Sequence, residues 1–155
     1  MLREGAVKPV QIRDASKLRI GVVVSNFNAD ITDTMLEGTR ETLARWSVKE
    51  ENIVTMYVPG AFEIPIACEK LLAREKLDAI VTLGCVLKGE TKHDEYIAHA
   101  TAEGVMRVML EHKIPISFGV LTPHTLEQAK ARSQGENNKG IEAARAALEM
   151  ALQYP

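Results

Sequence analysis

Four short apolar segments dominate this sequence, and a helical pattern of apolar residues follows each of them. The segments are residues 18–25, 52–58, 79–86 and 114–120. The first is apolar without interruption by a polar residue from Ile20 to Val24, which is typical of a parallel strand covered on both faces. Strands that alternate with helices predict a parallel sheet with helices on both sides and right-handed crossovers. The expected order of elements is therefore β-α-β-α-β-α-β-α-α.

Local signals place the helix boundaries. Pro65 is tolerated only in the first turn of a helix, so the second helix should begin just before it. Asp30 or Thr32 is expected to cap the first helix. Thr122 followed by Pro123 is expected to open the fourth, because proline favours the first helical position.

The amino-terminal segment, residues 1–17, has a weak pattern. Residues 7–12 are either a mobile tail or a short edge strand, and Pro9 argues against a central strand. Such a strand has no obvious partner in its own chain, so we expect it to pair with the sheet edge of a neighbouring subunit. The remaining residues, 18–155, are expected to form one domain, as the length of 155 residues suggests.

Composition excludes several classes of function. Hydrophobic residues make up 46% of the chain, enough for a core, and the net charge of −2 favours neither a nucleic-acid partner nor an anionic membrane. We expect no membrane-spanning segment and no signal peptide, because no apolar run is long enough. Cys68 and Cys85 stand in apolar surroundings and predict a reduced, cytoplasmic protein. The histidines lack metal-ligand spacing, so no metal is expected.

The segment 83–93, which joins the third strand to the third helix, carries the strongest signal for chemistry. Its glycines, Gly84 and Gly89, predict a strand-to-helix turn with unpaired N–H groups, which is a ready anion site. The segment also holds Lys88, the Thr91 hydroxyl and His93, whose imidazole changes charge near neutral pH. These features favour an enzyme that acts on a small phosphorylated molecule. The alternative is a turn that needs glycine for its geometry and carries a solvated histidine.

Other polar and aromatic residues are expected beside this segment. Ligands of parallel α/β sheets bind outside the carboxyl ends of the strands. Phe27 follows the first strand, Glu63 follows the second, and the segment ending in His93 follows the third. An aromatic ring, a carboxylate, an anion-binding turn and a histidine should therefore share one edge of the sheet. The residues alone predict a small-molecule site and do not name the substrate.

Five blocks of the sequence resemble the lumazine synthase family, which makes 6,7-dimethyl-8-ribityllumazine in riboflavin biosynthesis. The blocks are residues 25–28, 58–65, 83–93, 118–122 and 138–140, in the family's order. The resemblance extends from about Leu18 to the carboxyl terminus. It implies a three-layer α/β/α sandwich with a four-stranded, parallel, flavodoxin-like sheet of order 2-1-3-4.

The resemblance also implies a reaction and an assembly. The reaction condenses 5-amino-6-(D-ribitylamino)uracil with 3,4-dihydroxy-2-butanone 4-phosphate and releases phosphate and water. It needs neither a metal nor an organic cofactor. The implied partners are the small-molecule substrates and further copies of the chain in a homopentamer. Assembly into an icosahedral shell and association with riboflavin synthase are left open.

Residue roles follow from the same resemblance. His93 would shuttle protons. The residues that would contact the pyrimidine and its ribityl chain are Phe27, Ala61, Phe62, Glu63, Cys85, Val86, Leu87 and, from the neighbouring subunit, Phe118. Those that would bind the phosphate are Glu90, Thr91, Arg132 and Lys139. Lys88 stands where the family often has arginine, and an ammonium group does not replace a bidentate fork.

Two other functions compete with this interpretation. A flavodoxin-like redox domain would need a loop rich in Ser, Thr and Gly after the first strand, and residues 25–28 do not form one. A non-catalytic shell protein would bind flavin or lumazine without turnover. His93 and Arg132 argue against this second alternative, because pyrimidine binding alone requires neither.

Overall fold

The structure is a computed structural model of the chain and describes residues 8–155. In this part of the chain one sheet of four parallel strands has the order β2-β1-β3-β4. The strands are β1 (Ile20–Ser25), β2 (Ile53–Val58), β3 (Ala79–Cys85) and β4 (Ile116–Leu121). Ile20 pairs with Ile53 on one side and with Ala79 on the other, and Ile80 pairs with Ile116. The predicted parallel sheet of order 2-1-3-4 is confirmed.

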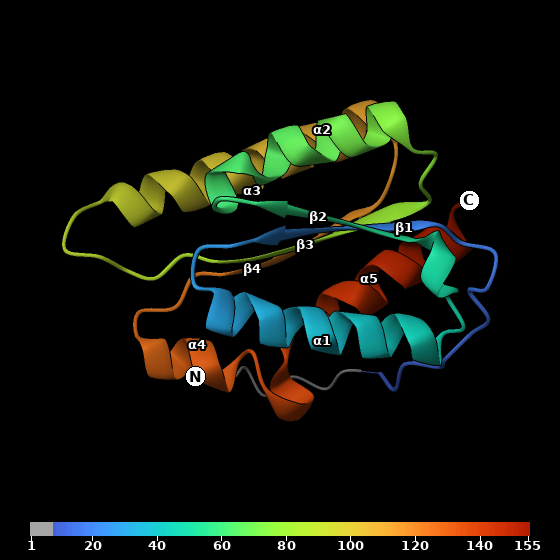
Figure 1. Cartoon of the computed structure of the whole chain (residues 1–155), viewed down its shortest axis with the longest axis horizontal. Coiled ribbons are helices and arrows are strands. Elements are labelled where there is room, and N and C mark those ends of the chain that lie inside the picture. The colour runs from blue at the N-terminus through green and yellow to red at the C-terminus, as the bar shows by residue number, and fades with distance from the viewer. Residues whose placement is uncertain (1–7) are drawn as a thin grey trace.

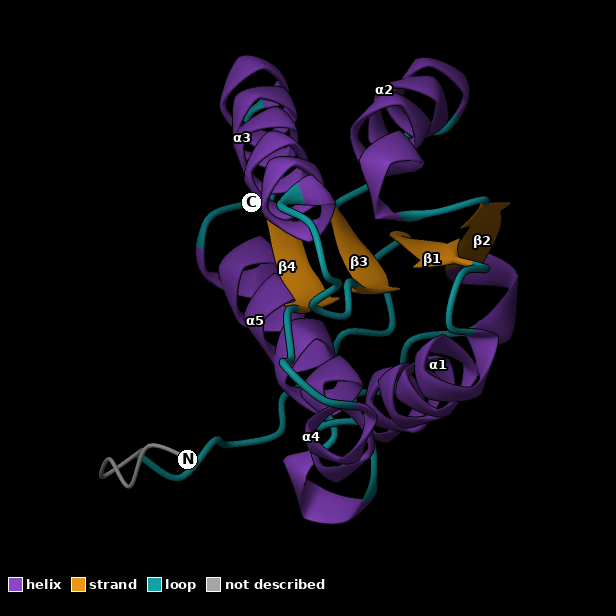
Figure 2. Ribbon diagram, turned by 90° about the vertical axis from the view of Figure 1, so that its left-hand side faces the viewer, coloured by secondary structure: helices purple, strands orange, loops and turns teal. Residues whose placement is uncertain are grey.

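Helices cover both faces of this sheet, as Figures 1 and 2 show. One layer holds α1 (Ala29–Arg45), α4 (Leu126–Ala131) and α5 (Lys139–Gln153). The other holds α2 (Ile64–Arg74) and α3 (His93–His112). Two apolar clusters, one on each face of the sheet, form the core. The predicted three-layer α/β/α sandwich is confirmed.

Burial explains why the first and third strands read as apolar runs. Every residue of β1 and of β3 is buried, because each strand has a neighbour on both sides and helices on both faces. The side chains alternate between the two clusters, with Val22 and Val24 on the α1 and α5 side and Val23 on the α2 and α3 side. The edge strand β2 is only half-buried, and Tyr57 is exposed on it.

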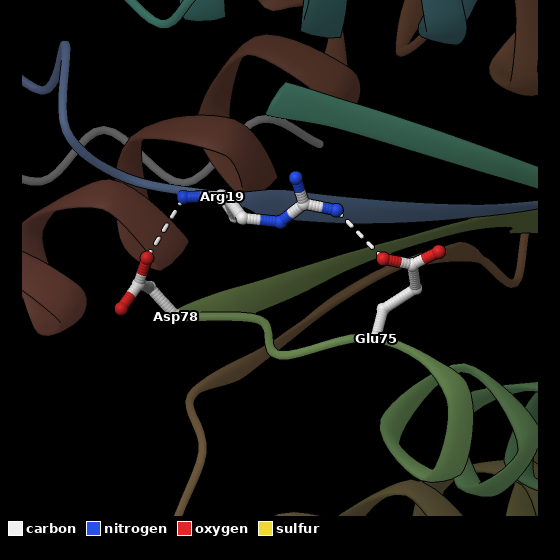
Figure 3. A network of polar contacts seen from close by, with 3 residues as sticks. All are labelled: Arg19, Glu75 and Asp78. Atoms are coloured by element: carbon white, nitrogen blue, oxygen red, sulfur yellow. Dashed lines mark hydrogen bonds and ion pairs between the residues drawn. The ribbon is translucent and has the colours of Figure 1, made fainter. Parts of the chain in front are cut away.

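A polar network holds the amino ends of the central strands, away from the edge where the site was predicted (Figure 3). The Arg19 guanidinium donates to the Glu75 carboxylate at 2.6 Å, and the Arg19 N–H donates to Asp78 Oδ2 at 2.8 Å. The Asp78 N–H returns a bond to the Arg19 carbonyl at 2.8 Å. These contacts join the chain just before β1 to the turn before β3.

The structure corrects two predicted helix starts and confirms a third. The N-cap of the first helix is Asn28 rather than Asp30 or Thr32, because the Asn28 carbonyl accepts the first helical N–H groups. The Thr32 hydroxyl donates to the Ser25 carbonyl instead of capping the helix. The helix α2 begins at Ile64 with proline in its first turn, as predicted.

The fourth helix also begins later than predicted. Thr125, not Thr122, is its N-cap, and the Thr125 hydroxyl accepts the Gln128 N–H at 3.1 Å. Pro123 stays in the preceding loop, where its carbonyl accepts the Lys88 N–H at 3.1 Å. The proline therefore supports the loop before α3 instead of opening a helix.

The described part of the amino-terminal segment lies against the domain, with Val10 packed on the apolar cluster on the α1 and α5 side of the sheet. Residues 8–12 have no regular secondary structure, and Val7 lies outside the described residues. Within residues 8–155, the first backbone hydrogen bond from this segment to the domain is that of the Ala15 N–H, which donates to the Trp46 carbonyl at 2.7 Å. Pairing of this segment with a neighbouring subunit stays a prediction. Within residues 8–155, no helix has the length and apolar character needed to cross a membrane.

Candidate active site

A cavity of about 640 Å³ lies at the carboxyl ends of β1, β2 and β3. Its volume is in the range of small-molecule sites in proteins. The predicted site residues that line it are Phe27, Ala61, Phe62, Glu63, Cys85, Val86, Leu87, Thr91 and His93. The structure therefore brings the aromatic ring, the carboxylate, the anion-binding turn and the histidine to one edge of the sheet.

The turn after β1 presents the aromatic ring. The Asn26 N–H donates to the Val58 carbonyl at 2.7 Å, and the Phe27 N–H donates to the Pro59 carbonyl at 3.0 Å. These bonds fix the turn to the end of β2. The Phe27 side chain is 71% exposed, so it is a platform in the cavity wall rather than a core aromatic. An exposed aromatic face is suited to stacking on a planar heterocycle.

Asn28, which sequence reasoning did not select, connects the first and third strand ends. Its backbone is left-handed, with φ 60° and ψ 48°, a region that asparagine tolerates better than most residues. Its Nδ2 donates to the Cys85 carbonyl at 2.9 Å. The polar turn and the tolerance of asparagine for this backbone were the available signals. Asn28 thereby positions both Phe27 and the backbone of β3 at the cavity.

Substitution of Asn28 by glycine and by alanine should separate the effect of the lost side-chain hydrogen bond from the effect of the left-handed backbone. Both substitutions remove the bond to the Cys85 carbonyl, but only alanine must also be forced into the left-handed backbone. We expect Asn28→Ala to lower the free energy of unfolding by about 1–2 kcal/mol more than Asn28→Gly does. Urea unfolding measures the difference, and Asn26→Ala, at an exposed neighbouring position, is the control. Equal losses in both variants would show that backbone strain at residue 28 is unimportant.

The turn after β2 forms the second wall. Ala61–Glu63 is a single 3₁₀ turn, closed by the Glu63 N–H, which donates to the Gly60 carbonyl at 3.2 Å. The buried Thr101 hydroxyl of α3 donates to the Ala61 carbonyl at 3.1 Å and ties this turn to the opposite wall. Phe62 is exposed and Glu63 is half-buried. A carboxylate in this place can accept hydrogen bonds from neighbouring hydroxyls of a ligand.

The loop between β3 and α3 forms the third wall. The helix begins at His93, whose N–H donates to the Thr91 hydroxyl at 3.3 Å, and the His93 side chain is exposed. The Asp94 carboxylate accepts the Gly89 N–H at 3.4 Å across this loop. The amino end of a helix of 20 residues thus borders the cavity. Its partial positive charge favours an anion there.

Four predicted site residues do not line this cavity. Glu90 is exposed on the loop, and Phe118 lies inside β4, packed against the apolar cluster under α2 and α3. Arg132 ends α4 and Lys139 begins α5, in the other helix layer. Figure 1 shows α4 at the same end of the sheet as the loop before α3, but on the opposite face. One chain alone therefore does not bring Phe118, Arg132 or Lys139 into this cavity.

The model of the family described as 6,7-dimethyl-8-ribityllumazine synthase matches residues 17–154. The chain belongs to this family. The predicted resemblance is confirmed, and it extends over the whole α/β sandwich. Lumazine synthases are enzymes of riboflavin biosynthesis that act on small molecules, which agrees with a cavity of this size at the carboxyl ends of the strands.

Thiol chemistry at the lumazine synthase cavity is unfavourable near neutral pH. Burial, followed by the nearby Asp30 carboxylate, raises the pKa of the Cys85 thiol to about 11. Burial, followed by Glu69, raises the pKa of Cys68 to about 12. A neutral thiol is a poor nucleophile. Cys85 therefore contributes shape and backbone groups to the cavity wall.

Asp94, Tyr96 and Ile97 also line the cavity, and sequence reasoning had not selected them for the site. Tyr96 lies three residues after His93 on the same helix, a spacing that places two side chains on one face. That spacing was the signal that would have found it. Among residues 8–155, no group of three or more His, Cys, Asp or Glu side chains is placed to hold a metal ion.

Proposed function

We propose that this chain condenses 5-amino-6-(D-ribitylamino)uracil with 3,4-dihydroxy-2-butanone 4-phosphate to give 6,7-dimethyl-8-ribityllumazine, phosphate and water. The observation that carries the proposal is one cavity lined by the exposed Phe27 ring, the Glu63 carboxylate and the His93 imidazole, in a chain that the family model matches over residues 17–154. The aromatic ring would stack on the planar pyrimidine, and the carboxylate would accept hydrogen bonds from the hydroxylated chain. The imidazole would transfer protons.

The pyrimidine half of the site uses side chains and backbone of the same chain. Phe27 stacks on the ring, and the segment from Ala61 to Glu63 meets the ribityl hydroxyls. The Val86 N–H already donates to the Leu121 carbonyl at 2.8 Å, so Val86 has only its carbonyl to offer the ring edge. The Cys85 carbonyl accepts Asn28 Nδ2, which holds this stretch of backbone in place.

The phosphate half of the site uses the amino end of α3 and groups from a neighbouring subunit. The turn N–H groups near Glu90 and the Thr91 hydroxyl bind phosphate oxygens at one side. Arg132 and Lys139 of the neighbour approach from the other, together with Phe118. Lys139 Nζ forms an ion pair with the Glu142 carboxylate at 2.8 Å, so its contact with phosphate competes with this pair. Arg132 is therefore the stronger phosphate ligand of the two.

His93 moves the protons that the condensation requires. The substrate amine adds to the ketone and loses water to form an imine. Phosphate is then eliminated, and the second amine closes the ring with loss of another water. Each stage removes a proton from nitrogen or carbon and delivers one to a leaving oxygen. An imidazole performs both transfers, because one ring nitrogen can accept a proton and the other can donate one.

A single assay tests the reaction. The purified protein is mixed with both substrates, and lumazine absorbance and phosphate release are followed together. We expect one phosphate for each lumazine formed. Binding of lumazine or flavin without turnover would support the shell-protein alternative and overturn the proposal. Flavin reduction without condensation would support the redox alternative.

We expect the protein to be a homopentamer in solution. Large apolar side chains are exposed on the described residues, among them Ile12 at 54% in the amino-terminal segment and, on α3, Met106 at 50% and Leu110 at 66%. Contact between subunits would remove this apolar surface from water. It would also supply the phosphate ligands that the cavity of one chain lacks. Light scattering measures the mass, and a monomer at micromolar concentration would contradict this proposal.

Larger assembly and location are separate parts of the proposal. Electron microscopy of the same sample distinguishes free pentamers from an icosahedral shell, and co-purification tests an association with riboflavin synthase. We propose the cytoplasm as the compartment, because Cys68 and Cys85 are free and buried.

A further inference from the structure

We propose that Asn138 is a positioning residue for the phosphate ligands, because it fixes the loop that carries Arg132 and Lys139 to helix α1. We call residues 132–139 the cation loop. The inference rests on the proposed function, in which both cations bind the phosphate of the second substrate. Asn138 itself is 6% exposed and points into the protein, so it acts through the loop and not by touching substrate.

The cation loop is closed at its base. The Lys139 N–H donates to the Arg132 carbonyl at 2.8 Å, which brings the two ends of the loop together. Ser133 is fully buried, and its hydroxyl donates to the Lys130 carbonyl at 3.2 Å. The two cationic side chains therefore leave the backbone at neighbouring points, a spacing that suits one anion. Closure of the loop alone does not fix its position on the protein.

The Asn138 carboxamide supplies that fixed position. Its Oδ1 accepts the Gly140 N–H at 2.8 Å and caps α5, while its Nδ2 donates to the Thr34 carbonyl of α1 at 3.0 Å. A cap requires only the oxygen, which serine or aspartate would provide equally well. The amide nitrogen performs the second task, which is to bind another helix. A buried carboxamide with both ends paired is costly to move.

Two glycines make room for this contact. A Cβ on Gly38 would lie 2.5 Å from Asn138 Nδ2, and a Cβ on Gly140 would lie 2.0 Å from the Met35 carbonyl oxygen. The buried Thr39 hydroxyl adds a bond to the Gly140 carbonyl at 3.1 Å. Helix α1 and the start of α5 are therefore in backbone contact, and the Asn138 amide occupies the space over Gly38. The end of the cation loop cannot slide along α1 without breaking these contacts.

The hydrogen bond from Asn138 to helix α1 matters for function because α1 is a long, well-packed helix. The helix begins at Ala29, directly after the turn that presents Phe27, and Asn138 is bound to its middle. The cations are thus held to a rigid helix of their own subunit, from which they would reach the cavity of the neighbouring subunit. Phosphate affinity depends on the placement of charged donors to within about 1 Å. Loosening the loop should weaken phosphate binding and leave pyrimidine binding unchanged.

Two substitutions test the inference from opposite sides. Asn138→Ser keeps an oxygen that caps α5 but is too short to reach the Thr34 carbonyl. Gly38→Ala leaves the cation loop intact and displaces the Asn138 amide from the α1 side. Gly21→Ala is the matched control, because its Cβ would lie 2.8 Å from Leu77 Cδ1 at the amino end of β1, away from the cation loop.

The readouts are the KM of each substrate, kcat, the inhibition constant of inorganic phosphate, and the melting temperature. We expect both variants to raise the KM of the phosphorylated substrate and the inhibition constant of phosphate roughly tenfold, the size of one charge-assisted hydrogen bond. The pyrimidine KM and kcat should stay at wild-type values. Gly21→Ala should change neither phosphate parameter.

Other outcomes overturn the inference. A lower melting temperature with wild-type phosphate parameters would make Asn138 a helix cap only. A fall in kcat with unchanged KM would place its effect on the chemistry rather than on phosphate binding. If one variant is not recovered folded, the other decides. Failure of the wild-type protein to make lumazine would overturn the proposed function instead, and calorimetric titration of inorganic phosphate would still compare wild type with the variants.

Discussion

Replacement of His93 by alanine is expected to lower kcat by roughly 10²–10⁴-fold, the contribution of a positioned general acid–base group. Its side chain is exposed and borders the cavity beside Thr91 and Asp94. The proposed pyrimidine contacts are Phe27 and the backbone from Cys85 to Leu87, which belong to other parts of the cavity wall. Pyrimidine affinity should therefore stay close to the wild-type value, since the imidazole acts on the barrier.

Stopped-flow measurement of single turnovers, with pyrimidine affinity from calorimetry, separates the two quantities. His99→Ala is the matched control, because His99 is an exposed histidine of the same helix that does not line the cavity. Loss of pyrimidine binding with unchanged turnover of bound substrate would make His93 a ligand contact. A wild-type rate in His93→Ala would remove it from the mechanism.

The sequence predicted those features of the fold that arise from repeated patterns. The continuous burial of β1 and β3 produces the apolar runs, and Pro65 located the start of α2 because proline has one tolerated place in a helix. Helix starts that depend on individual carbonyl groups were missed. Asn28 caps α1 with its backbone in a left-handed conformation, which no pattern of apolar residues reveals.

Some residues of the candidate site could likewise be predicted from the sequence pattern, and others could not. Phe27 and Glu63 belong to the turns after the first and second strands. They were predicted to share the cavity because parallel strands end at one edge of the sheet, and they do share it. Tyr96 was not predicted, although its spacing of three residues from His93 places it on the same face of α3. Arg132 and Lys139 could be assigned only through the family resemblance. In the proposed site they act on the cavity of a neighbouring subunit, and the sequence of one chain has no pattern that predicts such a contact.

The second large effect should come from Arg132, through a site shared between subunits. In one chain Arg132 lies in the α4 and α5 layer, whereas His93 begins α3 on the other face of the sheet. A head-to-tail ring would bring Arg132 of one subunit to the cavity of the next. Arg132→Ala should then weaken phosphate affinity by roughly 10- to 150-fold, corresponding to a lost charge-assisted hydrogen bond of about 1.5–3 kcal/mol. Arg74→Ala, at the exposed end of α2, is the control.

Mixed rings decide whether the site is shared. His93→Ala and Arg132→Ala are each expected to be weakly active and to damage opposite halves of the proposed site. The two proteins are therefore unfolded together and refolded as mixed rings. Random assembly should pair an intact His93 with an intact neighbouring Arg132 in about one site in four, because ring contacts are heterologous. Activity should rise well above the mean of the two parents, and native mass spectrometry confirms the mixing. Confirmed mixed rings with only the mean activity would place both residues of each site in one chain, because no rearrangement of subunits could then restore a site.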